Sequence, residues 1–88
     1  MEPYVDYNKN NDWFYRRFEK EVDDLELTWH RDERDRSVYV VAGFGWQFQY
    51  ENKVPFTINE GDTIFINKLD FHRLIKGDTN LILKIQEF

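Results

Sequence analysis

Cysteine is absent from the 88 residues, and Ser37 is the only serine. Without thiols the chain has neither disulfides nor thiolate ligands or nucleophiles, which is compatible with a reducing cytosol. No histidine and acid stand in a recognisable relation to Ser37, so serine hydrolase chemistry is not indicated. A Gly-rich phosphate-binding loop is also missing. Candidate chemistry is therefore restricted to imidazole, carboxylate and guanidinium groups.

Long apolar runs and clusters of positive charge are missing as well. No stretch is long enough for a signal peptide or a membrane span, so we expect a cytoplasmic protein without a membrane partner. The net charge is -5, and no Lys/Arg cluster offers a surface for phosphate backbones. Nucleic acid is therefore not an expected partner.

Aromatic residues are abundant, with eight Phe, five Tyr and three Trp. A chain of this length forms one domain and buries only a modest fraction of its surface, so its core must be dense or shared. Each aromatic side chain adds a large apolar area to a small core. This composition favours one compact β-domain that forms a homodimer.

Alternation of apolar and polar residues with period two predicts short strands over most of the chain. Trp46, Phe48 and Tyr50 oppose Gln47 and Gln49 in one such strand. Turn signals every eight to twelve residues are typical of an antiparallel sandwich or barrel, and no βαβ pattern competes with it. The predicted strands cover residues 25–30, 37–42, 46–50, 56–58, 63–67, 72–76 and 81–86.

The segment before these strands has a different pattern. In residues 13–22, WFYRRFEKEV, Phe14, Phe18 and Val22 recur at a spacing of four, as on one helical stripe. A short helix and an aromatic-rich arm fit this pattern equally well. We therefore divide the chain into an arm or short helix over residues 1–23 and a β-domain over residues 24–88.

Only two histidines are present, and both are candidate metal ligands. His30 and Asp32 are two residues apart, so on an extended backbone both side chains leave the same face. His72 begins a predicted strand just after a turn, where a barrel could bring it beside an earlier strand. Imidazole and carboxylate suit Fe, Mn, Ni or Zn better than Ca. Alternatively, each histidine is an ordinary hydrogen-bonding imidazole.

Two blocks of the sequence resemble the motifs of small single-domain cupins. The first motif, G-x5-H-x-H-x3-4-E-x6-G, has its spacing kept by His30, Asp32, Arg36 and Gly43. The second motif, G-x5-P-x-G-x2-H-x3-N, is matched in spacing by Gly61, Asn67, Leu69, His72 and Lys76. The words WHRD, DR-x-V, G-x-GWQFQ and HRLIKG are similar to those of short bacterial and phage cupins. The resemblance covers residues 29–86 and implies an antiparallel jelly-roll barrel, RmlC-like, with a divalent metal.

The chain departs from the cupin metal motif at two ligand positions. Asp32 stands where the family has its second His, and Arg36 stands where it has Glu. A guanidinium cannot bind a cation, so Asp35 is the candidate fourth ligand beside His30, Asp32 and His72. Alternatively, Arg36 pairs with Asp32 and leaves a metal-free polar pocket.

Three functions are compatible with these residues. The first is a divalent-metal cupin acting on, or binding, a small molecule. The second is a metal-free cupin that binds a small ligand or sugar through Arg36, Gln47, Gln49 and Arg73. The third is a dimeric interaction module without catalysis, which uses its aromatic face. Cupins as a class host many activities, so the resemblance is compatible with both catalytic and binding functions.

Overall fold

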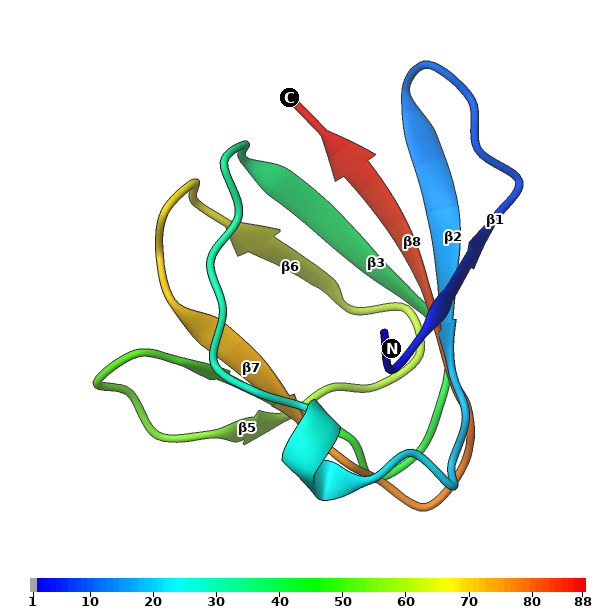
Figure 1. Ribbon diagram of the computed structural model, residues 1–88, viewed down its shortest axis with the longest axis vertical. Helices are drawn as coiled ribbons and strands as arrows, with labels where there is room; N and C mark the ends of the chain where they lie inside the picture. The colour runs from blue at the N-terminus through cyan, green and yellow to red at the C-terminus, as the bar shows by residue number, and fades with distance from the viewer. Residues whose placement is uncertain (1) are drawn as a thin grey trace.

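The computed structural model describes residues 2–88 as two facing antiparallel sheets that enclose a core (Figure 1). The larger sheet has the order β1-β2-β8-β3-β6, and the smaller sheet has the order β5-β4-β7. The only helical element in the described part is the 3-10 turn η1. The bounds are β1 Val5–Tyr7, β2 Trp13–Phe18, η1 Asp24–Glu26, β3 Arg36–Ala42, β4 Gln47–Tyr50, β5 Phe56–Thr57, β6 Thr63–Ile66, β7 His72–Ile75 and β8 Leu81–Glu87.

The predicted all-β, antiparallel fold is confirmed. Each of the predicted strands from residue 37 onward is present and agrees with β3 to β8 to within one residue at either end. Strand β8 lies in the middle of the larger sheet and pairs with β2 on one side and β3 on the other. No helix within residues 2–88 is long and apolar enough to cross a membrane.

Of the two alternatives for residues 13–22, the short helix is wrong, because this segment contains strand β2. Phe14, Arg16 and Phe18 face the interior, while Trp13 and Tyr15 lie on the outer face. Aromatic residues thus occupy both faces of the strand, so the sequence shows no alternation of apolar and polar residues. An arginine at an inner position breaks the apolar alternation further, so that only the spacing of four stands out.

The strand predicted over residues 25–30 is also wrong. Its first part is the turn η1, in which the Asp23 carboxylate accepts a hydrogen bond from the backbone N–H of Leu25 at 3.0 Å. Such a local bond competes with strand pairing. As a result, Leu25 is 84% exposed, and only His30 forms a β-bridge.

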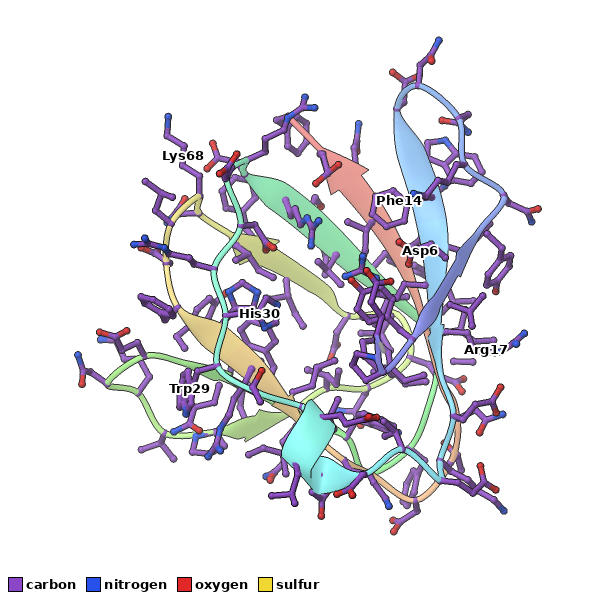
Figure 2. All side chains as sticks on the ribbon, in the orientation of Figure 1. Asp6, Phe14, Arg17, Trp29, His30 and Lys68 are labelled. Atoms are coloured by element: carbon purple, nitrogen blue, oxygen red, sulfur yellow. The ribbon has the colours of Figure 1, made fainter. Side chains whose placement is uncertain are left out.

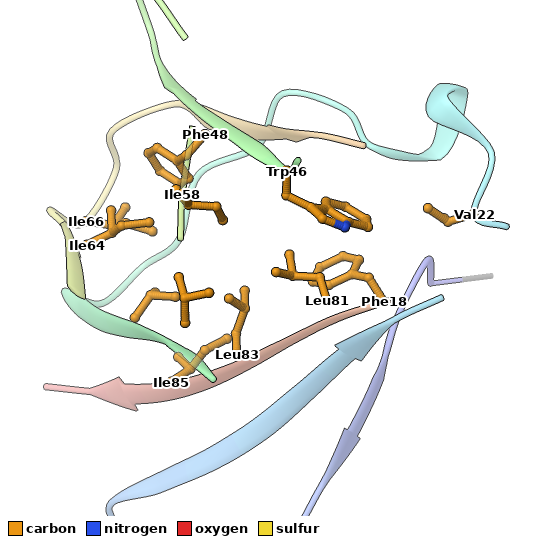
Figure 3. Close-up of a cluster of buried hydrophobic side chains, with 12 residues drawn as sticks. Phe18, Val22, Trp46, Phe48, Ile58, Ile64, Ile66, Leu81, Leu83 and Ile85 are labelled. Atoms are coloured by element: carbon orange, nitrogen blue, oxygen red, sulfur yellow. The ribbon is translucent and has the colours of Figure 1, made fainter. Parts of the chain in front are cut away.

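The core lies between the two sheets (Figure 3). Trp46 is fully buried, and its indole N–H donates to the carbonyl of Thr79 at 2.7 Å. Gly77 lies so close to this residue that a Cβ would collide with the Trp46 backbone. The core comprises Phe18, Val22, Val38, Val40, Trp46, Phe48, Ile58, Ile64, Ile66, Leu81, Leu83 and Ile85.

Candidate metal centre

A cavity of about 440 Å³ lies between the sheets next to this core. Its apolar wall comes from strands of both sheets and includes Phe48, Ile64 and Leu83. The polar side chains that line it come from residues 2–4, from residues 26–32 and from strands β2, β3 and β7. This volume falls within the range of small-ligand pockets, about 300–1,000 Å³.

The segment over residues 27–35 crosses the cavity and is fastened to strand β7. The backbone N–H of His30 donates to the His72 carbonyl at 3.1 Å, and the N–H of His72 donates to the His30 carbonyl at 2.9 Å. A third bond runs from the Leu69 N–H to the Asp32 carbonyl at 2.7 Å. Figure 2 shows His30 on this crossing segment, beside the strand that carries the other histidine. The pairing explains why residues far apart in sequence share one site.

His30, Asp32 and His72 form the candidate ligand group. Each offers one ligand atom, and these three atoms lie within 4.8 Å of one another. The two imidazole rings meet edge to face with centroids 4.2 Å apart. His72 is only 3% exposed and stacks on Phe48 at a centroid distance of 5.6 Å. The rings are therefore held by packing as well as by the backbone.

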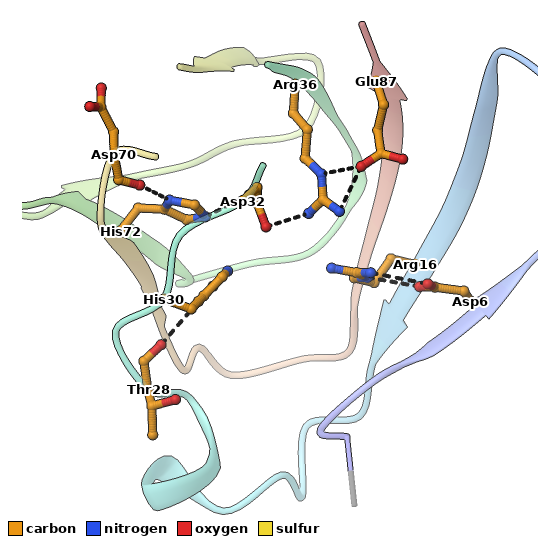
Figure 4. Close-up of polar contacts among 9 residues, drawn as sticks. All are labelled: Asp6, Arg16, Thr28, His30, Asp32, Arg36, Asp70, His72 and Glu87. Carbon is orange, nitrogen blue, oxygen red and sulfur yellow. Dashed lines mark hydrogen bonds and ion pairs between the residues drawn. The ribbon is translucent and has the colours of Figure 1, made fainter. Parts of the chain in front are cut away.

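The remaining hydrogen bonds fix how each imidazole is presented (Figure 4). Nδ1 of His30 lies 3.1 Å from the Thr28 carbonyl, and Nδ1 of His72 lies 2.9 Å from the Asp70 carbonyl. A carbonyl oxygen can only accept, so the proton of each neutral ring sits on Nδ1. The lone pair on Nε2 is then free for a cation. Histidines that bind metals in proteins are oriented in the same way, by a hydrogen bond from the other ring nitrogen.

The Asp32 carboxylate has two different oxygen environments. Oδ1 lies 3.2 Å from Nη1 of Arg36. Oδ2 lies 3.3 Å from Nε2 of His72, yet it is buried and has no hydrogen-bond partner among residues 2–88. Arg36 is itself anchored, because its Nε and Nη2 both lie 2.9 Å from Oε2 of Glu87. One oxygen of Asp32 is thus paired, and the other is left facing the imidazole.

Burial and neighbouring charges shift two pKa values in this group. Burial lowers the pKa of His30, because the charged imidazolium loses hydration, and this outweighs the hydrogen bond to Thr28. Burial by itself raises the pKa of Asp32, but the hydrogen bond that His72 Nε2 donates when the ring is doubly protonated, together with the charge of Arg36, prevails and lowers it. Both shifts favour a neutral His30 beside an ionised Asp32, which is the pair of forms that binds a metal ion.

The other residues predicted for the site lie elsewhere. The Asp35 carboxylate accepts a hydrogen bond from the Lys68 N–H at 2.7 Å and does not join the ligand group. Gln49 bonds Arg73, with 2.8 Å between its Oε1 and the Arg73 Nε. The cavity is lined by none of Gln47, Gln49 and Arg73. Of the four residues predicted for a ligand pocket, the structure places only Arg36 there.

Two charged residues at the site were not found from the sequence. Arg16 lines the cavity from β2, and Glu87 holds Arg36 from β8. Arg16 could have been suspected, because it stands between two apolar residues at the inward positions of a period-two pattern. No sequence signal distinguishes Glu87, whose role depends on the pairing of Arg36 with it across β3 and β8.

Comparison with known proteins identifies the fold. No protein-family model matches the chain, and no curated protein does. Among solved structures, a cupin-2 domain protein from Shewanella frigidimarina has a TM-score of 0.70 at 19% identity, over 97% of this chain and 79% of that one. A cupin domain from Bordetella pertussis has a TM-score of 0.64 at 16% identity, over 100% of this chain and 97% of that one. KdgF from a Halomonas species has a TM-score of 0.64 at 19% identity, over 97% and 77% of the two chains.

These likenesses extend over nearly the whole chain, including residues before 29 that carry none of the matched words. The protein therefore has the cupin fold. It is a small cupin-like protein with a His-His-Asp group in its cavity.

Proposed function

We propose that this cupin-like protein binds one divalent metal ion through His30, Asp32 and His72, and that it binds or transforms a small molecule in the adjoining cavity. The observation that carries the proposal is the environment of Oδ2 of Asp32, which is buried and has no hydrogen-bond partner within residues 2–88. An unpaired buried carboxylate oxygen is costly, and a cation relieves that cost.

One separation within the group fits this assignment. Two ligands of one tetrahedral ion, each about 2.0–2.2 Å from it, lie roughly 3.3 Å apart. Oδ2 of Asp32 and Nε2 of His72 are 3.3 Å apart. Imidazole and carboxylate ligands suit Fe, Mn, Ni or Zn. Such an ion acts as a Lewis acid toward a small molecule that occupies an open coordination position.

Arg36 is compatible with this arrangement although it cannot be a ligand. It pairs with Oδ1 of Asp32 and leaves Oδ2 available. By holding one oxygen and by bonding Glu87, it fixes the orientation of the carboxylate. Asp35 has no part in the proposed site, because its carboxylate accepts the Lys68 N–H. The protein ligands are thus three, which leaves positions for water and the small molecule.

Elemental analysis of purified protein tests the proposal. We expect near-stoichiometric Fe, Mn, Ni or Zn in the wild type and in Asp35→Asn, which removes a nearby carboxylate outside the group. We expect loss of that metal in His72→Ala and in His30→Gln. Equal metal content in wild type and both histidine variants, or none in the wild type after supplementation with each ion, would exclude this site.

The ion pair between Arg36 and Asp32, at 3.2 Å, favours a second candidate, a metal-free ligand-binding cupin. In that case the guanidinium alone neutralises Asp32, and the cavity binds a polar molecule. This candidate predicts no metal in any sample and a ligand affinity that falls in a folded Arg36→Gln variant. Metal content therefore decides between the two candidates.

A further inference from the structure

Arg16 is the charged group of the cavity to which the proposed metal site assigns no role. It projects from β2, in the wall opposite the segment that carries His30 (Figure 4). The residue is only 9% exposed. An arginine buried to this extent must have its charge and its N–H donors satisfied. Its surroundings therefore indicate what the cavity is built to receive.

One edge of the Arg16 guanidinium is already occupied. Nε lies 2.7 Å from Oδ1 of Asp6, and Nη2 lies 3.0 Å from Oδ2 of the same carboxylate. The ring of Tyr4 covers one face of the guanidinium, with Cζ 3.6 Å from its centroid. Nη1 forms no hydrogen bond within residues 2–88, and the guanidinium lies in the cavity wall. A rigid, oriented donor is thus left for a ligand.

The charges within the site favour an anion once a metal is bound. Two guanidiniums, Arg16 and Arg36, face three carboxylates, those of Asp6, Asp32 and Glu87. With neutral imidazoles these groups carry a net charge of about -1, which a divalent ion changes to about +1. The two other acids in the lining, Glu2 and Glu26, are exposed, so water and salt screen them. A ligand with one negative charge would then balance the site.

The lining that comes from Ile58 and from strands β4, β6 and β8 is apolar. Ile58, Ile64, Ile66, Leu83 and Ile85 all contribute to it, and none offers a side-chain hydrogen bond. Burying the several hydroxyls of a sugar against this surface would leave them without partners. An alkyl or aryl body would instead gain from leaving water, by about 25 cal/mol for each Å² buried.

We infer that the cavity receives a small monocarboxylic acid with an apolar body, and that the free donors of Arg16 bind its carboxylate. This inference rests on the proposed metal-binding function for its charge balance. Arg16 is a binding residue for the carboxylate and is separate from the metal ligands. The apolar body occupies the volume between the carboxylate and the group formed by His30, Asp32 and His72.

The test measures ligand binding and metal content separately on the same samples. Metal-loaded wild type is titrated calorimetrically with butanoate, hexanoate, octanoate and benzoate, and with the neutral amide of each. We expect at least one acid to bind roughly 10-fold or more tightly than its amide, which is the range of a hydrogen bond to a charged group. This comparison needs no variant, so it cannot fail through misfolding.

Two substitutions separate binding from a structural role. Arg16→Gln should weaken the acid roughly 10-fold or more while the metal content stays unchanged. Asp6→Asn breaks the same ion pair but leaves the guanidinium in place and adds positive charge, so it should keep or strengthen acid binding. If Arg16 were only structural, both variants would weaken the acid alike, and that result would overturn the inference.

The remaining outcomes distinguish the two proposals. Bound metal, with acids and amides binding equally or not at all, overturns the carboxylate assignment and leaves the metal site standing. Binding of an acid that depends on Arg16, in a protein that takes up no metal, supports the carboxylate assignment and overturns the metal function. Neither metal nor acid binding excludes both.

Discussion

Nε2 of His72 lies 3.3 Å from Oδ2 of Asp32, and neither atom has another hydrogen-bond partner among residues 2–88. With the His72 proton on Nδ1, these are two acceptors that face each other in a buried place. Packing of the imidazole against Phe48 and the bond from Arg36 to Oδ1 prevent the two from turning apart. A cation near both atoms would stabilise this arrangement, and so would a proton on Nε2, which turns the contact into an ion pair.

Asp32→Asn tests the carboxylate within the proposed metal site. The amide keeps the size and shape of the side chain but removes the negative charge of the carboxylate that would bind the ion. We expect metal affinity to fall by more than the roughly 10–100-fold typical of changes outside the ligand shell. Competition with a metal-sensitive dye measures the dissociation constants, and Asp35→Asn is the control with unchanged affinity.

Metal should also stabilise the fold, because the segment carrying His30 and Asp32 and the strand carrying His72 come from distant parts of the chain. At a free concentration about 100 times the dissociation constant, binding adds about 2.7 kcal/mol. For a domain of this size we expect the midpoint of thermal unfolding to rise by roughly 10 °C or more. EDTA should reverse the shift. A rise of equal size in His72→Ala would mean that the ion binds elsewhere.

Arg36→Gln should destabilise the protein, because it leaves the partly buried carboxylates of Asp32 and Glu87 without the guanidinium that pairs with both. The Arg36 side chain is 14% exposed and contacts both carboxylates. Breaking such a pair costs about 3–5 kcal/mol when it is fully buried, so about 2–3 kcal/mol is expected here. Chemical denaturation measures the loss. Arg17→Gln, which removes the exposed pair with Glu19, should cost under about 1 kcal/mol.

The hydroxyl of Tyr50 provides a pH-dependent test of the fold. It donates to the Phe65 carbonyl at 2.6 Å, and burial, assisted by the negative charge of Asp70, raises its pKa above 10.0. Because the folded protein holds this proton more tightly, the resulting stability is complete below the pKa of the unfolded chain. It is lost as the pH rises through the folded pKa.

Ultraviolet titration of the phenolates should therefore show a late-ionising component in the wild type that Tyr50→Phe lacks. The free energy of unfolding of the wild type should decline over the same pH interval, while that of Tyr50→Phe should lack this component. An identical decline in both proteins would show that another group is responsible.

The sequence predicted the strands where outward residues are polar and inward residues are apolar, as in β4, where Phe48 is buried between two glutamines. It failed at β2, because Trp13 and Tyr15 place aromatic rings on the outer face and Arg16 places a charge on the inner one. An alternation of apolar and polar residues predicts which side chains are buried only where the buried side chains are apolar and the exposed ones are polar.

The candidate site was predicted in part for a similar reason. The two-residue spacing of His30 and Asp32 required only an extended backbone, which the bridge to His72 supplies even though no full strand forms. Gln47, Gln49 and Arg73 could not be assigned to a face from their spacing alone, because a one-residue change in register reverses inside and outside. The homodimer predicted from the aromatic content stays a prediction.

The central place of β8 affects how the chain is made. Strands β2 and β3 both pair with residues 81–87, which leave the ribosome after all the other strands. During synthesis, Phe14 and Phe18 on β2 and Val38 and Val40 on β3 therefore have no sheet neighbour on that side. Newly made chains expose these strand edges until β8 emerges, and unpaired edges of this kind are where chains associate wrongly.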